Sequence, residues 1–259
     1  MSAPGDKPTT KVPGREPRTA PLPKRFYKEV TVGEQPDGFA IQLDGRPVRT
    51  PRKRHLVVPT RALAEAIAEE WAAQGEKIDP ATMPLSKLAI TTIDGVAENA
   101  AEVRNDIVHF AGSDLLCYRA GAPSALADLQ AKAWDPTLRW IESETGERFF
   151  LAEGVMPVTQ SAAALACVGR LLAPFGAFAL ASLHVMTTLT GSAFLALAVA
   201  MRRMPVADAW GAAHLDEDWQ IARWGIDVEA AERRERRWQE MQAAARFLDL
   251  LGTASRKTG

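Results

Sequence analysis

The 259-residue chain is poor in cysteine, with only Cys117 and Cys167, and these two residues lie fifty positions apart. This spacing excludes a disulfide-rich scaffold and the paired CxxC of a zinc knuckle, and it favours a reducing compartment. The first residues also lack the continuous apolar stretch that a secretory signal peptide requires. These absences predict a bacterial cytoplasmic protein.

The short motifs of nucleotide-binding and hydrolytic enzymes are missing as well. The sequence has no GxxxxGK(S/T) phosphate loop, no GxGxxG turn, no GxSxG nucleophile elbow and no HExxH pair. Its four histidines never occur four residues apart, the spacing that brings two imidazoles to one metal ion on a helix. We therefore expect no catalytic residues, no cofactor and no metal ion. A small-molecule enzyme of unrecognised type remains the alternative.

A near-neutral net charge of −1 conceals an uneven distribution of charge. Residues 1–54 contain twelve Lys and Arg against six Asp and Glu, whereas residues 55–201 contain nine against sixteen. A basic end this short is typical of a solvated tail, and the body has no basic excess that would follow a phosphate backbone. We expect no nucleic-acid partner.

The chain begins with a proline-rich stretch and then shows β-type patterns. Six prolines lie among Lys, Arg and Thr in residues 1–23, which indicates a disordered tail. Asp44-Gly45 is a hairpin turn signal, because these residues tolerate the positive φ of a tight turn. The expected strands are Phe26–Val32, Phe39–Leu43 and His55–Val58.

Helical patterns begin after the expected strands. Thr60 is a suitable N-cap for a helix over about 61–74, in which Leu63, Ile67 and Trp71 recur at four-residue steps as core positions. Further helices are expected over 85–96, 99–111 and 124–145, and a last one over 227–250. Two apolar breaks, 114–118 and 149–158, are interpreted as strands that return to the first sheet.

The change in pattern predicts an α+β fold class. An N-terminal β-containing domain with helices should be followed by an all-α C-terminal domain, with the helix at 124–145 belonging to either side. We expect a disordered tail at 1–23, an α+β domain at 24–157, a helical domain at 158–250 and a disordered C-terminus at 251–259.

Residues 171–201 contain no Asp, Glu, Lys or Arg and are long enough to span a bilayer. However, sixteen of these 31 residues are Ala, Gly, Ser, Thr or His, Pro174 interrupts the run, and Thr190-Gly191-Ser192 suggests a break. Small residues allow helices to approach closely. We therefore expect buried helices rather than an integral membrane anchor.

The most concentrated group of polar side chains is Asp216-Glu217-Asp218, followed by Trp219 and Arg223. Successive positions on a helix diverge by about 100°, so these carboxylates cannot easily converge on one substrate atom. A solvated helix face and a protein-docking surface remain open for this strip. Tryptophans are abundant after residue 130, and most of them are expected to pack between helices, although Trp and Arg also dominate binding energy at interfaces.

Several blocks together resemble the assembly chaperone family of F-type ATP synthase, and within it the factor dedicated to the alpha subunit. The blocks are RFYKEVTV, GFAIQLDGRPVRTP, LVVPTRALAEAIAEEWAAQ, MPLSKLAITTID, DLLCYRA, WDPTLRW and LDEDWQIARWG. They span Lys24 to Arg246 in the expected order, and the first 23 residues have no counterpart.

The resemblance implies a chaperone that binds the free alpha subunit and prevents its aggregation before the beta subunit arrives. It implies an N-terminal β-containing domain before a helical one, and either an alpha-proteobacterial cytoplasm or a mitochondrial matrix as the location. A peripheral membrane or scaffold protein is the third hypothesis. The candidate partner-binding residues are Asp216, Glu217, Asp218, Trp219 and Glu240 on the late helices, with Arg46 and Arg49 beside the hairpin.

Overall fold

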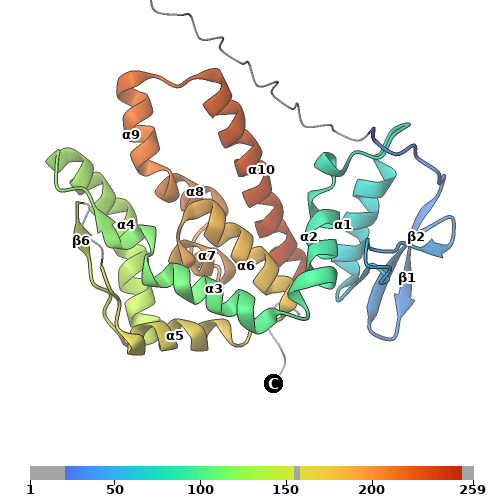
Figure 1. Ribbon diagram of the computed structural model, residues 1–259, viewed down its shortest axis with the longest axis horizontal. Coiled ribbons are helices and arrows are strands. Elements are labelled where there is room, and N and C mark those ends of the chain that lie inside the picture. Colours follow the sequence, from blue (N-terminus) through green and yellow to red (C-terminus); the bar gives the residue numbers. More distant parts are fainter. Residues whose placement is uncertain (1–20, 155–157, 253–259) are drawn as a thin grey trace, which may run out of the picture.

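The computed structural model describes residues 21–154 and 158–252. A small sheet covered by one helix lies at one end of the molecule, and a larger helical body forms the rest (Figure 1). The strands are β1 Val30–Gln35, β2 Gly38–Leu43, β3 Arg46–Pro47, β4 Val57–Val58, β5 Tyr118–Arg119 and β6 Ala152–Glu153. The α-helices are α1 Arg61–Ala72, α2 Pro84–Thr91, α3 Ala100–Gly112, α4 Ser124–Thr145, α5 Ala162–Leu172, α6 Ala177–Thr190, α7 Ala193–Ala200, α8 Val206–Ala213, α9 Leu215–Trp224 and α10 Val228–Leu251. Short helical turns are η1 Pro80–Thr82, η2 Thr92–Val96 and η3 Leu115–Cys117. The predicted α+β class is confirmed.

The four-stranded sheet is antiparallel and has β2 at its centre. β1 pairs with β2 along its whole length, while β3 and β4 pair with the other edge of β2. The predicted turn at Asp44-Gly45 is confirmed, since it joins β2 to β3 with φ values of +47° and +75°. The prediction of a strand from Phe26 is wrong in its start, which lies at Val30.

Tyr27 explains why the strand starts late. Its ring is buried, and its hydroxyl donates a hydrogen bond to the carbonyl oxygen of Trp71, at 2.8 Å. The two rings also meet edge to face, with centroids 5.7 Å apart. The segment therefore covers the end of α1 instead of pairing in the sheet.

Helix α1 begins where its sequence predicts. The Leu63 amide donates to the Thr60 hydroxyl oxygen at 3.3 Å, so Thr60 is the N-cap. Leu63 and Ile67 are fully buried, and Trp71 packs against the same core. The Thr60 hydroxyl also donates to the carbonyl oxygen of Leu250, at 2.8 Å, which ties α1 to the end of α10.

The two apolar breaks do not return to the first sheet, so that prediction is wrong. β5 and β6 pair with each other in parallel, with Tyr118 opposite Ala152. The reason lies at Asp114, whose carboxylate accepts hydrogen bonds from the Ser192 hydroxyl and the Phe194 amide at the start of α7. This contact holds the first break in the helical body, away from the four-stranded sheet. Residues 155–157 of the second break lie outside the described residues.

The long uncharged run folds as two buried helices, as predicted. It forms α6 and α7, separated at Gly191, which has a φ of +68° that favours glycine. Ser192 then caps α7 by accepting from the Leu195 amide, at 3.0 Å. Residues 193–198 are all buried. Within the described ranges, no helix is both long and apolar enough to cross a bilayer.

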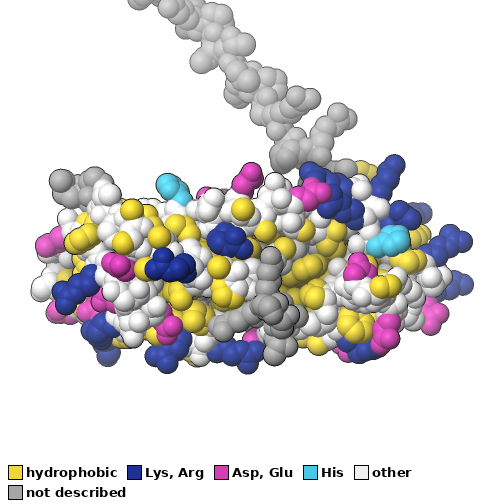
Figure 2. All heavy atoms as spheres, turned by 90° about the horizontal axis from the view of Figure 1, so that it is seen from below, with side chains coloured by type: hydrophobic (Ala, Val, Ile, Leu, Met, Phe, Trp, Pro, Cys, Tyr) yellow, Lys and Arg dark blue, Asp and Glu magenta, His cyan; other side chains and the backbone are white. Residues whose placement is uncertain are grey.

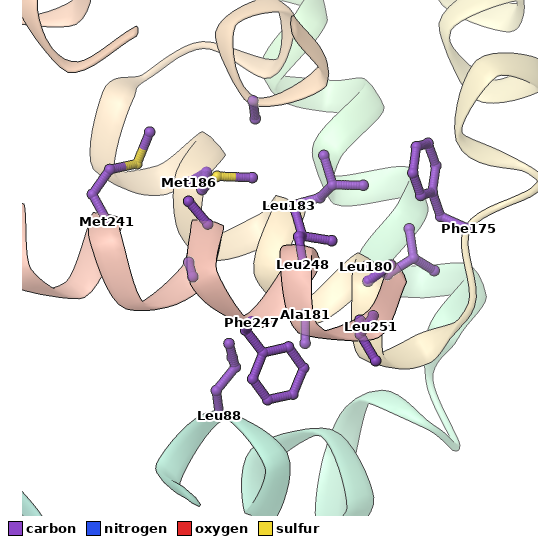
Figure 3. Packing of buried hydrophobic residues seen from close by; sticks show 14 of the residues in the cluster. Leu88, Phe175, Leu180, Ala181, Leu183, Met186, Met241, Phe247, Leu248 and Leu251 are labelled. Carbon is purple, nitrogen blue, oxygen red and sulfur yellow. The ribbon is translucent and has the colours of Figure 1, made fainter. Parts of the chain in front are cut away.

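Helix α10 connects the two ends of the molecule. Its C-terminal half packs on α6, α2 and α1. In Figure 3, Phe247 of α10 lies beside Leu88 of α2, while Leu248 lies beside Leu183 of α6. Leu251, assigned from the sequence to the C-terminal tail, is instead the last buried residue of α10.

Buried side chains from both halves of the chain form one continuous core. α3 packs on α5 and α6, and α4 packs on α5, α7 and α9, so the helix predicted at 124–145 lies with the C-terminal helices. The boundary at 157–158 stays a prediction. Of the expected tails at 1–23 and 251–259, residues 1–20 and 253–259 lie outside the described residues. Pro23, within the first expected tail, is held to the body, since its carbonyl oxygen accepts from the Ile78 amide at 2.8 Å.

Candidate partner-binding site

Five of the seven predicted partner-binding residues lie on one helical hairpin. Asp216, Glu217, Asp218 and Trp219 are on α9, and Glu240 is exposed on α10. Figure 1 shows these two helices projecting from the body, with α8 at the base of α9 and the connecting turn at their far end. We call α9, the connecting turn and the first half of α10, residues 215–240, the α9–α10 hairpin.

Asp216 fastens this hairpin to the body. Its carboxylate accepts from the side-chain amide of Gln130 on α4, at 2.8 Å. Gln130 is itself almost fully buried, and its carbonyl oxygen accepts from the Ala120 amide at 2.8 Å. Asp216 is therefore a structural contact of α9 and is only partly available to a partner.

Asp218 and Glu217 join the two helices of the hairpin. The guanidinium of Arg234 on α10 lies 2.5 Å from the Asp218 carboxylate and 4.0 Å from that of Glu217. The hydrogen bond from Asp218 raises the pKa of Arg234 above its usual value. About half of each carboxylate side chain stays accessible, so the acidic strip both braces the hairpin and faces solvent.

Aromatic side chains reinforce both ends of α9. At the base, the His214 ring stacks on Trp210 with centroids 3.7 Å apart, and burial lowers the pKa of His214. Further along, the Arg223 guanidinium lies 3.4 Å from the ring centroid of Trp219. The arrangement places a cation and a half-buried aromatic beside the acidic strip.

Arg46 and Arg49 lie at the opposite end of the molecule. Both are exposed beside the β2–β3 turn, and Arg49 donates to the carbonyl oxygen of Lys53 at 3.1 Å. Figure 2 shows several Lys and Arg side chains at this end of the molecule. The structure therefore does not bring the two predicted groups together.

A cluster of exposed apolar residues, absent from the predicted partner-binding residues, lies at the turn of the hairpin. Trp224 is 86% exposed, Val228 is 75% exposed and Ile226 is 46% exposed. By contrast, Trp134, Trp140 and Trp210 are buried, as expected for tryptophans that pack between helices. The signal was present in the sequence: these apolar residues lie around Gly225, where helix α9 ends.

Two hollows lie in the described surface. One of about 340 Å³ lies between the α7–α8 turn and the end of α10, and one of about 510 Å³ lies beside α3. None of the groups with a shifted pKa lines either hollow. Burial raises the pKa of Asp114 to about 7, but this carboxyl has no exposed surface and caps α7. Among the described residues, no three His, Cys, Asp or Glu side chains are grouped to hold a metal ion.

Comparison with known proteins decides the family. Residues 24–142 match the family model described as ATP12 chaperone protein. The crystal structure of Atp12 from Paracoccus denitrificans is 40% identical, with a TM-score of 0.84 over 88% of this chain and 98% of that one. The chain belongs to the Atp12 chaperone family.

Two further solved structures agree with this assignment. The protein Atu1473 from Agrobacterium tumefaciens is 50% identical, with a TM-score of 0.86 over 90% of this chain and 88% of that one. An aspartate-to-lysine mutant of the Paracoccus Atp12p is 39% identical, with a TM-score of 0.84 over 88% and 97% of the two chains. The family resemblance noted in the sequence is thus confirmed. The Atp12 family comprises non-enzymatic assembly factors that bind the F1 alpha subunit during ATP synthase assembly.

Proposed function

We propose that this Atp12-family chain binds the free alpha subunit of an F-type ATP synthase and prevents its aggregation until the beta subunit replaces the chaperone. Family membership across nearly the whole chain carries this proposal. The bacterial relatives favour the cytoplasm as the location, with the mitochondrial matrix as the alternative.

The physical need for such a chaperone follows from subunit assembly. A subunit that awaits its neighbours exposes the large apolar interface that it will later bury, and such surfaces self-associate when they are free. A chaperone must cover that interface and then leave it. This task requires a broad surface with moderate affinity rather than a deep pocket.

We assign the α9–α10 hairpin to this task. It carries Asp216, Glu217, Asp218, Trp219 and Glu240, and α9 contains no fully buried residue. Acidic groups on such a surface accelerate the encounter with a basic partner and fix its orientation. Arg46 and Arg49 are proposed as a second, separate contact that a large client would reach at the other end of the molecule.

The test is copurification of tagged chaperone with the alpha subunit in cells that express alpha alone, beta alone, or both. We expect a stoichiometric complex with alpha, none with beta, and loss of the complex when beta is supplied with alpha. Binding to beta alone, or failure to retain alpha in the soluble fraction, would contradict the proposed function.

A further inference from the structure

The turn of the α9–α10 hairpin presents three large apolar side chains to solvent. Trp224 ends α9, Val228 begins α10, and Ile226 lies between them. We call these three residues the hairpin tip. Figure 1 shows that the turn lies at the end of the hairpin farthest from α8.

Single exposed apolar side chains are common on protein surfaces, but the hairpin tip places three of them within five positions. Tryptophan is also the residue most enriched among those that dominate binding energy. The neighbouring Trp219 is covered by Arg223, whereas Trp224 is 86% exposed. Packing within the chain therefore does not account for the hairpin tip.

The backbone on both sides of the hairpin tip is fixed by helix caps. The Gly225 amide donates to the Ile221 carbonyl oxygen at 2.8 Å, and φ at Gly225 is +79°, which favours glycine. Asp227 caps α10 by accepting from the Ala230 amide at 2.9 Å. With the brace from Asp218 to Arg234, these contacts fix the backbone from which the apolar side chains project before any partner arrives, which reduces the entropy cost of binding.

The charge around the hairpin tip indicates the chemistry of its partner. Residues 214–240 contain eight Asp and Glu against five Arg, a net charge of −3, and Arg236 lies 3.8 Å from Glu232. Two of the acidic residues, Glu229 and Glu232, are exposed in the first turns of α10. An apolar contact on a hairpin of net negative charge, with Asp227 and Glu229 beside it, complements an apolar patch that is bordered by Lys and Arg.

We propose that the hairpin tip inserts into an apolar, basic-rimmed patch on the free alpha subunit, and that Trp224 is its main anchor. This inference rests on the proposed function and names the surface that performs it. Glu229 and Glu232 guide the encounter, while Asp216 and Asp218 keep the hairpin in position.

The experiment measures binding of the full-length chaperone to alpha subunit freshly diluted from denaturant, by biolayer interferometry. The test variant combines Trp224→Ser, Ile226→Ser and Val228→Ser. The matched control combines Phe150→Ser and Leu151→Ser, which removes exposed apolar side chains outside the hairpin. Because all five side chains are exposed, both variants should melt at the wild-type temperature. We expect the Kd for the alpha subunit to rise at least about 30-fold in the tip variant and less than about threefold in the control.

A second variant tests the charge argument. Glu229→Lys combined with Glu232→Lys should slow association about tenfold at low salt, leave dissociation nearly unchanged, and lose this difference at high salt. Equal association rates of wild type and this variant at low salt would overturn the inference that the patch on the alpha subunit has a basic rim.

The outcomes separate the two proposals. If the wild-type chain does not bind alpha, the proposed function fails. If wild type binds and the tip variant binds equally well, or the control loses as much as the tip variant, only the inference about the hairpin tip fails. A wild-type dimer by light scattering that the tip substitutions dissolve would assign the hairpin tip to a second copy of this chain and overturn the inference.

Discussion

Replacement of Asp114 by Asn should remove a pH dependence of stability that this buried carboxyl creates. One carboxylate oxygen accepts from the Leu116 amide at 3.1 Å and from the Ser192 hydroxyl at 2.7 Å, and the other accepts from the Phe194 amide at 3.1 Å. Burial nevertheless outweighs these bonds and raises the pKa of Asp114 from 3.8 to about 7. The folded protein therefore holds this proton more tightly than the unfolded chain.

The sign and size of the effect follow from that pKa difference. A raised carboxyl pKa contributes stability that is fully present below the unfolded value of 3.8 and is lost as the pH rises through about 7. At about 1.4 kcal/mol per pKa unit, the wild-type protein should lose roughly 2 to 3 kcal/mol of unfolding free energy between pH 5 and pH 8 through this group. Asn at this position does not titrate.

The assay is urea unfolding of wild type and Asp114→Asn from pH 5 to pH 8. The wild type should be the more stable protein at pH 5. In the variant the Asn amide nitrogen is itself a donor and would face either the Phe194 amide or the Leu116 amide, so a buried donor would lose its acceptor. The difference between the two proteins should shrink by roughly 2 to 3 kcal/mol toward pH 8. Asp128→Asn on the exposed face of α4 is the matched control and should show no such change. A difference that stays constant across this range would refute the reasoning.

Three further predictions concern the contacts that hold the hairpin and join the two ends of the molecule. Glu217→Lys combined with Asp218→Lys should weaken suppression of alpha-subunit aggregation about tenfold, with an unchanged melting temperature, because interface charges set orientation while exposed charges add little to stability. Light scattering tests this, and adding Arg234→Glu should restore part of the activity if the carboxylates act by bracing the hairpin. Thr60→Val should lower the free energy of unfolding by about 1 to 2 kcal/mol, since it removes the N-cap of α1 and the hydrogen bond to Leu250. Thr60→Ser keeps the hydroxyl and should not lower it, and urea unfolding measures both variants. Gln130→Leu should lower the free energy of unfolding by about 2 kcal/mol in the same assay and should also weaken capture of the alpha subunit, because it leaves the Ala120 amide and Asp216 without their partner. Equal capture by wild type and variant would show that the Asp216 contact does not position the hairpin.

The helices of this protein were predictable because their signals are local. α1, α3, α4 and α10 lie within a few residues of the ranges expected from apolar spacing and capping residues. The break at Gly191 was also readable, since glycine favours the left-handed conformation that separates α6 from α7. Each of these features depends on residues that are neighbours in the sequence.

The failures concern contacts between distant segments. The break at 114–118 has the composition of a strand, but Asp114 bonds to Ser192 and Phe194, far along the chain, and so directs the break to the helical body. Likewise, the pattern of Phe26 and Tyr27 fits a strand until Trp71 supplies a hydrogen-bond acceptor for the Tyr27 hydroxyl. Apolar periodicity does not specify which distant segment a stretch of chain will pack against. That distant segment decides whether the stretch pairs in the sheet or packs against helices.

The candidate site shows the same division between local and distant information. The acidic run at 216–218 was identified as a possible docking surface, yet its link to Gln130 on α4 could not be read from the sequence. The sequence predicts that most of the late tryptophans pack between helices but does not tell which ones, because composition does not distinguish the exposed ring of Trp224 from a buried one. Only its position at the end of α9, next to Gly225, differs from theirs.

The hairpin combines two properties that a transient chaperone needs. Its inner half is anchored through Asp216, Arg234 and the stacked ring of His214, whereas α9 itself contributes no fully buried side chain to the core. Local stability is low where few apolar contacts are buried, so the hairpin can move as a unit without opening the core formed by α6 and α7. Because the exposed apolar groups are concentrated at the hairpin tip, a few strong contacts there can anchor the chaperone while the rest of the hairpin surface covers the client interface. With the binding energy concentrated in these few contacts, the beta subunit can displace the chaperone from the alpha subunit.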